Sequence, residues 1–347
     1  MIKRVRYDAA MPSQTFDPAD YKGLQASSIP ASLAASPHMR FDSAEDASVF
    51  FARELDFIKS QTYDVLYPEL TALKNFPQSS EVSDGSETVT YYSYEKTGFA
   101  KIIQNYATDL PRADVKGKPT TVPIRALGAS YGYSIQEMRA SRLAGKSLDV
   151  RKGESARYAI EREINRIAWA GDESGLQGVL SPGTDVPLYV LPNNAAGNST
   201  RWEDKSAEEI LEDVKGMIAG VATSTMDVER PDTLALPSDA FLRIAHTQLN
   251  PLSNYTILKW ILENIPDLKE IIRVPELNGN SGVTPYPGEG VALLYTNDPQ
   301  KFTIETPMPF YQHPVQPKGL EFEVPCEARV GGAMIYYPLS MLIAVGV

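Results

Sequence analysis

Apolar residues recur at helical spacing over several long segments of the chain. The clearest segment is about 149–170, where Ile160, Ile164 and Ile167 form one stripe and charged residues occupy other faces. Gly171 follows directly, at the position where a glycine commonly ends a helix. The pattern predicts a helix of about 22 residues, roughly 33 Å long. The same spacing predicts further helices over about 44–74 with a break at Pro68, over 135–143, after Ser206, around Phe241 and around Ile257.

Residues 86–133 follow a different pattern, in which apolar and polar residues alternate. Val89 and Tyr91 alternate with their neighbours on the outward strand, and Val122, Ile124 and Ala126 do so on the return. Between these strands lie about 24 mainly polar residues, 95–118. A two-stranded ribbon is only marginally stable alone in water. The pattern therefore predicts a long hairpin that needs another surface to lie on.

The rest of the chain mixes both kinds of element. From about 206 to 298, predicted helices alternate with short buried strands at 233–236, 271–274 and 291–295, and a Gly/Asn/Pro loop covers 278–289. From about 302 to 347 the pattern is strand-like throughout. The sequence thus predicts an α+β fold.

The first 42 residues lack helical or strand periodicity and are rich in Pro, Ser and Ala. Such a segment cannot alone bury enough apolar surface to offset the entropy that it loses on ordering. We expect a neighbouring subunit to hold it. Lys3, Arg4 and Arg6 make its start basic, which predicts contact with phosphate or an acidic surface as the alternative to a solvated terminus.

Composition and charge exclude several classes of function. With 33 basic and 44 acidic side chains the chain carries a net charge of −11, which argues against gripping nucleic acid through a basic face. One cysteine, Cys326, excludes an internal disulfide framework and a multi-cysteine zinc site. No apolar run approaches the roughly 18 residues of a membrane span, and no secretory signal follows Met1. We expect a soluble chain made inside the cell, with no membrane partner.

No motif predicts catalysis. Gly288-Glu-Gly290 lacks the third glycine of a nucleotide-binding fingerprint, and Gly331-Gly332 is interpreted as a tight bend between strands. Cys326 lies in an apolar strand pattern that is typical of a small core residue. We therefore predict no catalytic residue, no cofactor and no metal site. A soluble acidic α/β enzyme is only a remote alternative, because no group of residues suggests a substrate pocket.

The order of these elements resembles a known family. Thr-Gly-Phe-Ala-Lys-Ile-Ile at 97–103, Asp-Leu-Pro-Arg-Ala-Asp-Val-Lys-Gly at 109–117 and Tyr-Gly-Tyr-Ser at 131–134 occur along the hairpin. Asn-Arg-Ile-Ala-Trp-Ala-Gly-Asp follows at 165–172, and Gly-Leu-Gln-Gly-Val-Leu, a strand in the family pattern, at 175–180. From about residue 44 onward the chain resembles the major capsid proteins of tailed bacteriophages with the Hong Kong ninety-seven fold.

That resemblance implies the following division: 1–42, an N-arm; 43–85, a helix and lead-in to the peripheral domain; 86–133, an extended hairpin called the E-loop; 134–199, the peripheral domain with its spine helix; 200–310, the axial domain; and 311–347, strands that return to the peripheral domain.

The resemblance also implies a function. The chain would self-assemble into pentamers and hexamers that form an icosahedral head around double-stranded DNA, inside the host bacterial cytoplasm. Partners would be other copies of the chain, a separate scaffolding protein, a portal, a decoration protein, and weakly contacted DNA. An encapsulin-like nanocompartment is the alternative. Contact candidates at the E-loop tip are Tyr106, Asp109, Arg112, Asp114, Lys116 and Lys118, and those in the N-arm are Lys3, Arg4 and Arg6.

Overall fold

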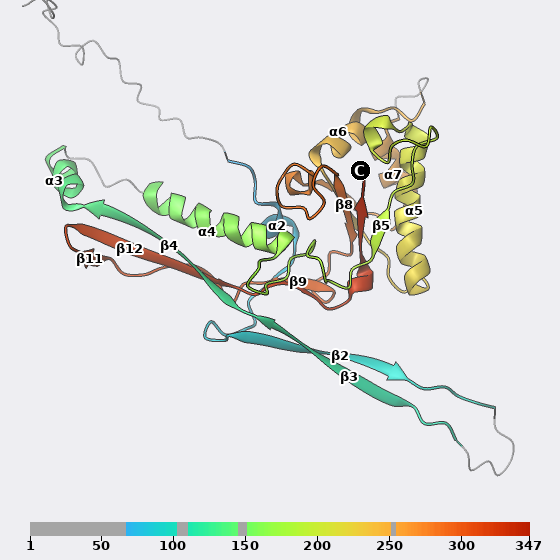
Figure 1. Ribbon diagram of the computed structural model, residues 1–347, viewed down its shortest axis with the longest axis horizontal. Helices are drawn as coiled ribbons and strands as arrows, with labels where there is room; N and C mark the ends of the chain where they lie inside the picture. The colour runs from blue at the N-terminus through green and yellow to red at the C-terminus, as the bar shows by residue number, and fades with distance from the viewer. Residues whose placement is uncertain (1–66, 103–109, 145–150, 251–254) are drawn as a thin grey trace, which may run out of the picture. The chain divides into compact units, whose positions relative to one another are not determined.

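The computed structural model describes residues 67–102, 110–144, 151–250 and 255–347. These residues form helices and strands in comparable amounts, so the predicted α+β class is confirmed (Figure 1). The N-arm, most of the helix predicted over 44–74, and Lys3, Arg4, Arg6, Tyr106 and Asp109 lie outside the described residues. From 67 to 70 the chain is not helical, and the short helix α2 spans Thr71–Asn75.

A five-stranded sheet has the strand order β5-β14-β8-β6-β7. Its strands are β5 (Leu188–Val190), β14 (Met341–Val345), β8 (Val291–Tyr295), β6 (Thr233–Leu236) and β7 (Glu270–Arg273). Strand β14 is antiparallel to β8 and parallel to β5, whereas β6 is antiparallel to β8 and parallel to β7. The segment 341–345 is thus hydrogen-bonded within this sheet.

The two faces of this sheet bury different partners, as the alternation of side chains along a strand requires. Leu234, Leu294 and Leu342 share a core with helices α5 (Ala207–Thr225), α6 (Ser238–His246) and α7 (Ile257–Asn264), which lie together beside the sheet in Figure 1. Leu293 and Ile343 belong to the core of the opposite face. The predicted helix start at Ser206 is confirmed by a capping box with Glu209.

On that opposite face, four aromatic side chains meet. The Phe76 ring lies 4.6 Å from the Trp169 ring, 5.5 Å from that of Tyr295 and 5.3 Å from that of Phe302, measured between centroids. These residues come from the ends of α2 and of the long helix α4 (Arg151–Ala170) and from strands β8 and β9 (Phe302–Glu305). Aromatic packing therefore joins α4 to the five-stranded sheet.

Helix α4 packs on a second sheet. Its apolar stripe, Ile160, Ile164 and Ile167, shares a core with Val324 and Cys326 of strand β12 (Glu321–Val330), so the predicted stripe is confirmed. On one side β12 pairs with β4 (Arg125–Ser134), and on the other with β10 (Met308–Gln312) and β11 (Gln316–Lys318). Short helix α3 (Ile135–Ala144) follows β4, as predicted.

The segment that follows α4 is built differently from the prediction, although the helix ends as predicted. Gly171 has φ +73° and ends the helix as expected. The strand predicted over 175–180 is wrong, because these residues instead satisfy the helix end: Val179 N–H donates to the Ala168 carbonyl at 2.9 Å and Leu180 N–H to that of Trp169 at 2.8 Å.

The remaining short elements connect these layers. Strand β1 (Gln78–Ser79) and strand β13 (Gly332–Ile335) pair with opposite sides of β9. Gly331 lies between β12 and β13, and Gly332, the first residue of β13, has φ +76°, which confirms the bend predicted there. Within the described ranges, the single-turn helices are η3 (Trp202–Asp204), η4 (Pro275–Leu277) and η5 (Pro338–Ser340).

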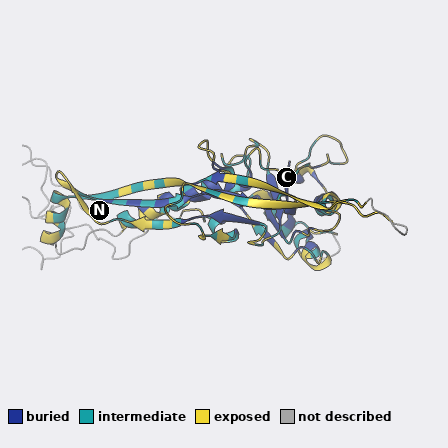
Figure 2. Cartoon of the chain, turned by 90° about the horizontal axis from the view of Figure 1, so that it is seen from below, coloured by how far each residue is buried: buried dark blue, intermediate teal, exposed yellow. Residues whose placement is uncertain are grey.

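The hairpin consists of β2 (Thr88–Thr97) and β3 (Asp114–Pro123), antiparallel over their whole lengths, and β3 is followed by β4. The sequence predicts a loop over 95–118, but Glu95 pairs with Lys116 and Thr97 with Asp114. Backbone hydrogen bonds hold this part of the ribbon together. Its side chains are not buried on either face, so the sequence lacks the apolar–polar alternation that predicts a strand. Most residues of both strands are exposed (Figure 2).

Candidate assembly surfaces

The hairpin has one end fixed to the rest of the chain. The Tyr91 hydroxyl donates to the Ile335 carbonyl at 3.1 Å, and its ring meets that of Tyr336 edge-on at 5.0 Å. Val122 and Ile124 are buried at the same end. Burial raises the pKa of the Tyr91 hydroxyl, which therefore stays a neutral donor. The root of the hairpin is thus part of the folded core.

The outer half of the ribbon is amphipathic but exposed on both faces. Residues that pair directly across antiparallel strands project to the same face. Tyr92, Tyr94 and Val115 therefore share one face with Lys96, which pairs with Val115, and the first three are 63, 71 and 56% exposed. Glu95 and Lys116 lie on the other face. An unpartnered apolar face of this kind is typical of a binding surface.

The predicted contact residues that the structure describes all lie on the polar side or in the loop. Asp114, Lys116 and Lys118 alternate along one face of β3, and Arg112 precedes the strand; all four are exposed. The sequence analysis missed the aromatic face. The alternation of Tyr92 and Tyr94 is visible in the sequence. The pattern instead draws attention to Val89 and Tyr91, which lie on the opposite face of β2 and face the core only near the root of the hairpin.

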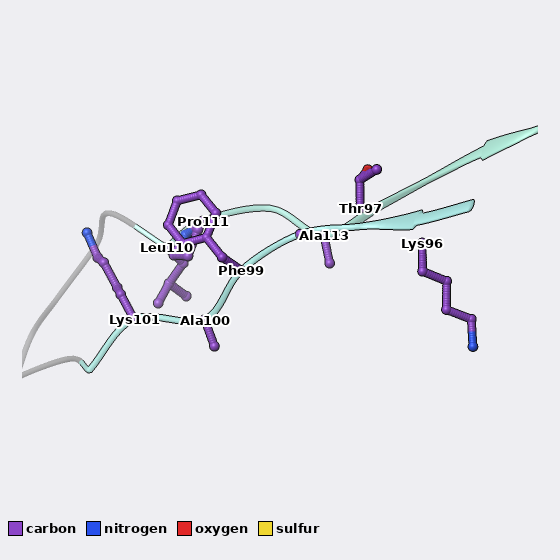
Figure 3. A pocket seen from close by; sticks show the side chains of 9 residues that line it. Lys96, Thr97, Phe99, Ala100, Lys101, Leu110, Pro111 and Ala113 are labelled. Carbon is purple, nitrogen blue, oxygen red and sulfur yellow. The ribbon is translucent and has the colours of Figure 1, made fainter. Parts of the chain in front are cut away.

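Beyond the strands, the two chain segments border a shallow hollow of about 570 Å³ that is open to solvent. In Figure 3 the Phe99 ring lies beside Leu110 and Pro111, with the Lys101 side chain on the same side. Gly98 allows the segments to meet here, because a Cβ at this position would lie 2.8 Å from the Ala113 backbone. We call Phe99, Leu110, Pro111 and Lys101 the tip cradle.

Charge is divided unevenly along the chain. Residues 200–310 contain nine basic and seventeen acidic side chains, and so carry most of the net charge of −11. In contrast, the hairpin segment 95–118 contains five basic and three acidic side chains. The hairpin of one copy and the 200–310 region of another are thus complementary in charge.

Several polar groups are buried for structural reasons. Lys205 Nζ lies 2.6 Å from Asp213 Oδ2, with 1 and 2% of the two side chains exposed, and Trp202 Nε1 donates to the same oxygen at 2.9 Å. Burial raises the pKa of the Asp213 carboxyl against the opposing effect of Lys205. Cys326 is buried, and burial raises the pKa of its thiol. Neither arrangement is open to a substrate.

Asn165 is a second buried polar residue that the sequence analysis missed, although an Asn beside the apolar stripe of α4 is a visible signal. Its Oδ1 accepts from the Ala72 N–H at 2.8 Å, and its Nδ2 donates to Glu276 Oε1 at 2.8 Å. The other Glu276 oxygen accepts from the Thr71 hydroxyl at 2.8 Å. This network ties α2 and η4 to α4.

Among the described residues, no group of three or more His, Cys, Asp or Glu side chains is placed to hold a metal ion. No helix in the described ranges is long and apolar enough to cross a membrane.

Solved capsid structures share this fold. The capsid of Myoviridae phage XM1 matches with a TM-score of 0.72 and 17% identity, covering 87% of this chain and 100% of that one. The capsid of a native GTA particle matches with a TM-score of 0.59 and 10% identity, covering 85 and 96%. A structure from Mycobacterium phage Ogopogo matches with a TM-score of 0.54 and 12% identity, covering 86 and 99%. The fold is therefore of the Hong Kong ninety-seven type.

The sequence itself gives the family. The family model described as major capsid protein matches residues 98–347, so this chain belongs to the major capsid protein family. No curated protein gives a significant match. Family membership places the chain among structural proteins and favours the phage capsid over the encapsulin-like alternative.

Proposed function

We propose that copies of this chain form pentamers and hexamers that close into an icosahedral phage head around double-stranded DNA. Membership of the major capsid protein family supports the shell, and the amphipathic outer half of the hairpin supports the way in which copies join. In this proposal the hairpin is the E-loop, 149–170 is the spine helix and 200–310 is the main part of the axial domain.

The hairpin carries the argument, because its outer half has no partner within its own described chain. In the part of the chain that the structure describes, strands β2 and β3 pair only with each other, and such a ribbon is marginal in water. Laying the Tyr92 and Tyr94 face on a neighbouring subunit would remove two large aromatic side chains from water. Burial of this kind stabilises an interface by about 1.5–3 kcal/mol for each large apolar side chain that becomes fully buried.

The remaining partners follow from charge and family. Each subunit carries −11, so repulsion accumulates as copies gather, and local complementarity has to overcome it. We propose a separate scaffolding protein, a portal and a decoration protein as partners. The acidic chain would contact packaged DNA only weakly, with Lys3, Arg4 and Arg6 as the contact in the N-arm.

Replacing both exposed tyrosines tests the proposal. Tyr92→Thr with Tyr94→Thr keeps residues that favour strands, so the ribbon is expected to stay paired. Size-exclusion chromatography with light scattering, followed by electron microscopy, should show large particles for the unmodified chain and only monomers or capsomers for the double variant. Circular dichroism should be the same for both.

The matched control is Glu95→Thr with Lys116→Thr, which also replaces two residues but on the polar face. We expect this control to assemble. Undiminished particle yield from the tyrosine variant, or equal loss from both variants, would rule out the apolar face as the contact surface.

A further inference from the structure

Strand β9 ends on a buried acidic residue, Glu305. Its side chain is 2% exposed, and among the described residues no group forms a hydrogen bond with its Oε1. The buried carboxyls of Asp213 and Glu229 differ, because each accepts from a lysine at 2.6 Å. A buried carboxylate without a cation or a full set of donors is costly. The Glu305 carboxyl is therefore expected to be neutral while it stays buried.

Glu305 lies where the chain leads into the hairpin. Ser79, the last residue of β1, pairs directly with Glu305. Residues 80–87, which we call the lead-in, then connect β1 to β2. Partway along the lead-in, the Asp84 carbonyl accepts from the Arg329 guanidinium. The lead-in is thus held at Asp84 by a cation and at its start beside a buried carboxyl.

The titratable groups that act on this carboxyl within the described ranges are acidic. They are Glu81 in the lead-in and Tyr336, which follows β13. The Tyr336 hydroxyl shares a hydrogen bond with that of Thr303 at 2.9 Å. The bend between β12 and β13 contributes the uncharged Gly331, where a Cβ would lie 3.2 Å from the Cβ of Glu305. The surroundings of Glu305 thus disfavour its charged form.

The protonation of Glu305 is coupled to the position of the lead-in. Burial raises the pKa of its carboxyl and Glu81 raises it further, whereas the Ser79 hydroxyl and the Val82 N–H act in the opposite direction without cancelling the rise. If the lead-in opens, water reaches the carboxyl and its pKa returns toward that of an ordinary glutamate. A group with a higher pKa in the closed form stabilises that form at low pH, and this stabilisation is lost as pH rises through the closed-form pKa.

We propose that Glu305 is a pH-sensitive latch, whose neutral carboxyl keeps residues 79–83 closed against β9 and whose carboxylate lets them open. The Asp84–Arg329 contact and the Tyr91 bond to the Ile335 carbonyl stay in place, so opening loosens the base of the hairpin without detaching it. The inference goes beyond the proposed function, because it concerns a conformational equilibrium of the single subunit.

Hydrogen exchange of the full chain tests the latch, under dilute conditions that keep the chain unassembled. The Thr306 amide reports opening, because it donates to the Ser79 carbonyl at 2.9 Å. Its protection factor, corrected for the intrinsic exchange rate at each pH, should fall by about tenfold per pH unit above about pH 4.3 and level off beyond the closed-form pKa. The Val179 amide, which bonds to the end of α4, should keep a constant protection factor.

Glu305→Gln removes the charge while keeping the shape of the side chain. The Thr306 protection factor of this variant should vary by less than about twofold over the same pH range. The matched control is Glu87→Gln, which removes an exposed carboxyl from the same lead-in and should leave the pH dependence unchanged. Ser79→Ala supplies a second variant. It removes a hydroxyl that lowers the pKa of Glu305, so the fall in protection should continue to higher pH.

A Thr306 protection factor that does not change with pH in the unmodified chain, or a fall that survives Glu305→Gln, would overturn the inference. If Glu305→Gln does not fold, an unchanged pH profile in Ser79→Ala would overturn it instead. These measurements use unassembled chains, so their failure would leave the proposed function intact. Equally, a chain that formed no particles would refute the proposed function without affecting the latch.

Discussion

Replacing Lys205 with methionine removes the positive half of an ion pair that is buried between η3 and α5. Methionine matches the length of the lysine stem, so packing changes little. Asp213 keeps its hydrogen bond from Trp202 Nε1 but loses the ammonium at 2.6 Å. Because only 2% of the Asp213 side chain is exposed, water cannot replace the lost partner.

Removing one partner of a buried pair costs about 3–5 kcal/mol. The remaining Trp202 donor places the expected loss at the lower end, about 3 kcal/mol near pH 7. Burial already raises the pKa of Asp213, and the loss of Lys205 raises it further. A carboxyl with a raised folded-state pKa favours the folded state at low pH and disfavours it as pH rises through that pKa. The loss should therefore shrink as pH falls from the folded-state pKa toward about 4, and be smallest below that, where the carboxyl is protonated in both states.

Urea unfolding followed by tryptophan fluorescence, under dilute conditions that keep the chain unassembled, measures the effect. The exposed pair Lys259–Glu263, at 3.7 Å, supplies a control, and Lys259→Met should change stability by less than about 0.5 kcal/mol. Adding Asp213→Asn to Lys205→Met should recover most of the loss, since the amide is neutral and its oxygen still accepts from Trp202. A loss below about 1 kcal/mol at pH 7, or one independent of pH, would refute the reasoning.

Three further outcomes are expected. Asn165→Leu should destabilise the chain by about 1–3 kcal/mol and speed hydrogen exchange at Ala72, since that amide loses its acceptor, whereas Ala159→Leu on the exposed side of α4 should not. Gly332→Ala should abolish soluble expression because its Cβ would strike the Gln177 carbonyl. Gly319→Ala, with a similar positive φ but open space around it, should cost only about 1 kcal/mol by thermal melting. Raising NaCl from about 20 to 200 mM should increase particle yield by screening the subunit charge of −11; higher yield at low salt would show that attraction between subunits dominates.

The elements that the sequence predicts correctly carry local signals. The stripe of α4, the glycine after it and the capping box at Ser206 depend on residues within a few positions of one another. The segment 175–180 fails for the opposite reason. Its apolar residues suggest a strand, but its backbone groups bond to a helix end that is close only in the folded chain.

The sequence predicts where the assembly surface lies but not which of its faces is apolar and which is charged. The hairpin and its need for a partner follow from the alternation in 86–133, whereas the division of its outer half into an aromatic and a charged face depends on strand register. The tip cradle brings Phe99 beside Leu110 and Pro111 across a loop. The Lys205–Asp213 pair buries a lysine, a residue type that sequence reasoning places in solvent, against the buried face of α5. Neither pairing leaves a periodic trace in the sequence.

Strand β14 has a consequence for the timing of synthesis. It lies between β5 and β8, yet it begins at Met341, about 150 residues after β5 ends at Val190. At about 5–20 residues per second, β5 is made roughly 8–30 s before β14, the strand that joins it to β8. Strand β8 is made a few seconds before β14. Until then the helices α5 to α7 can pack only on β8, β6 and β7, because β5 joins the sheet through β14. A ribosome-bound chain is therefore expected to stay without a finished acidic surface for that interval, and nascent chains emerging side by side on one messenger RNA would not dock on one another prematurely.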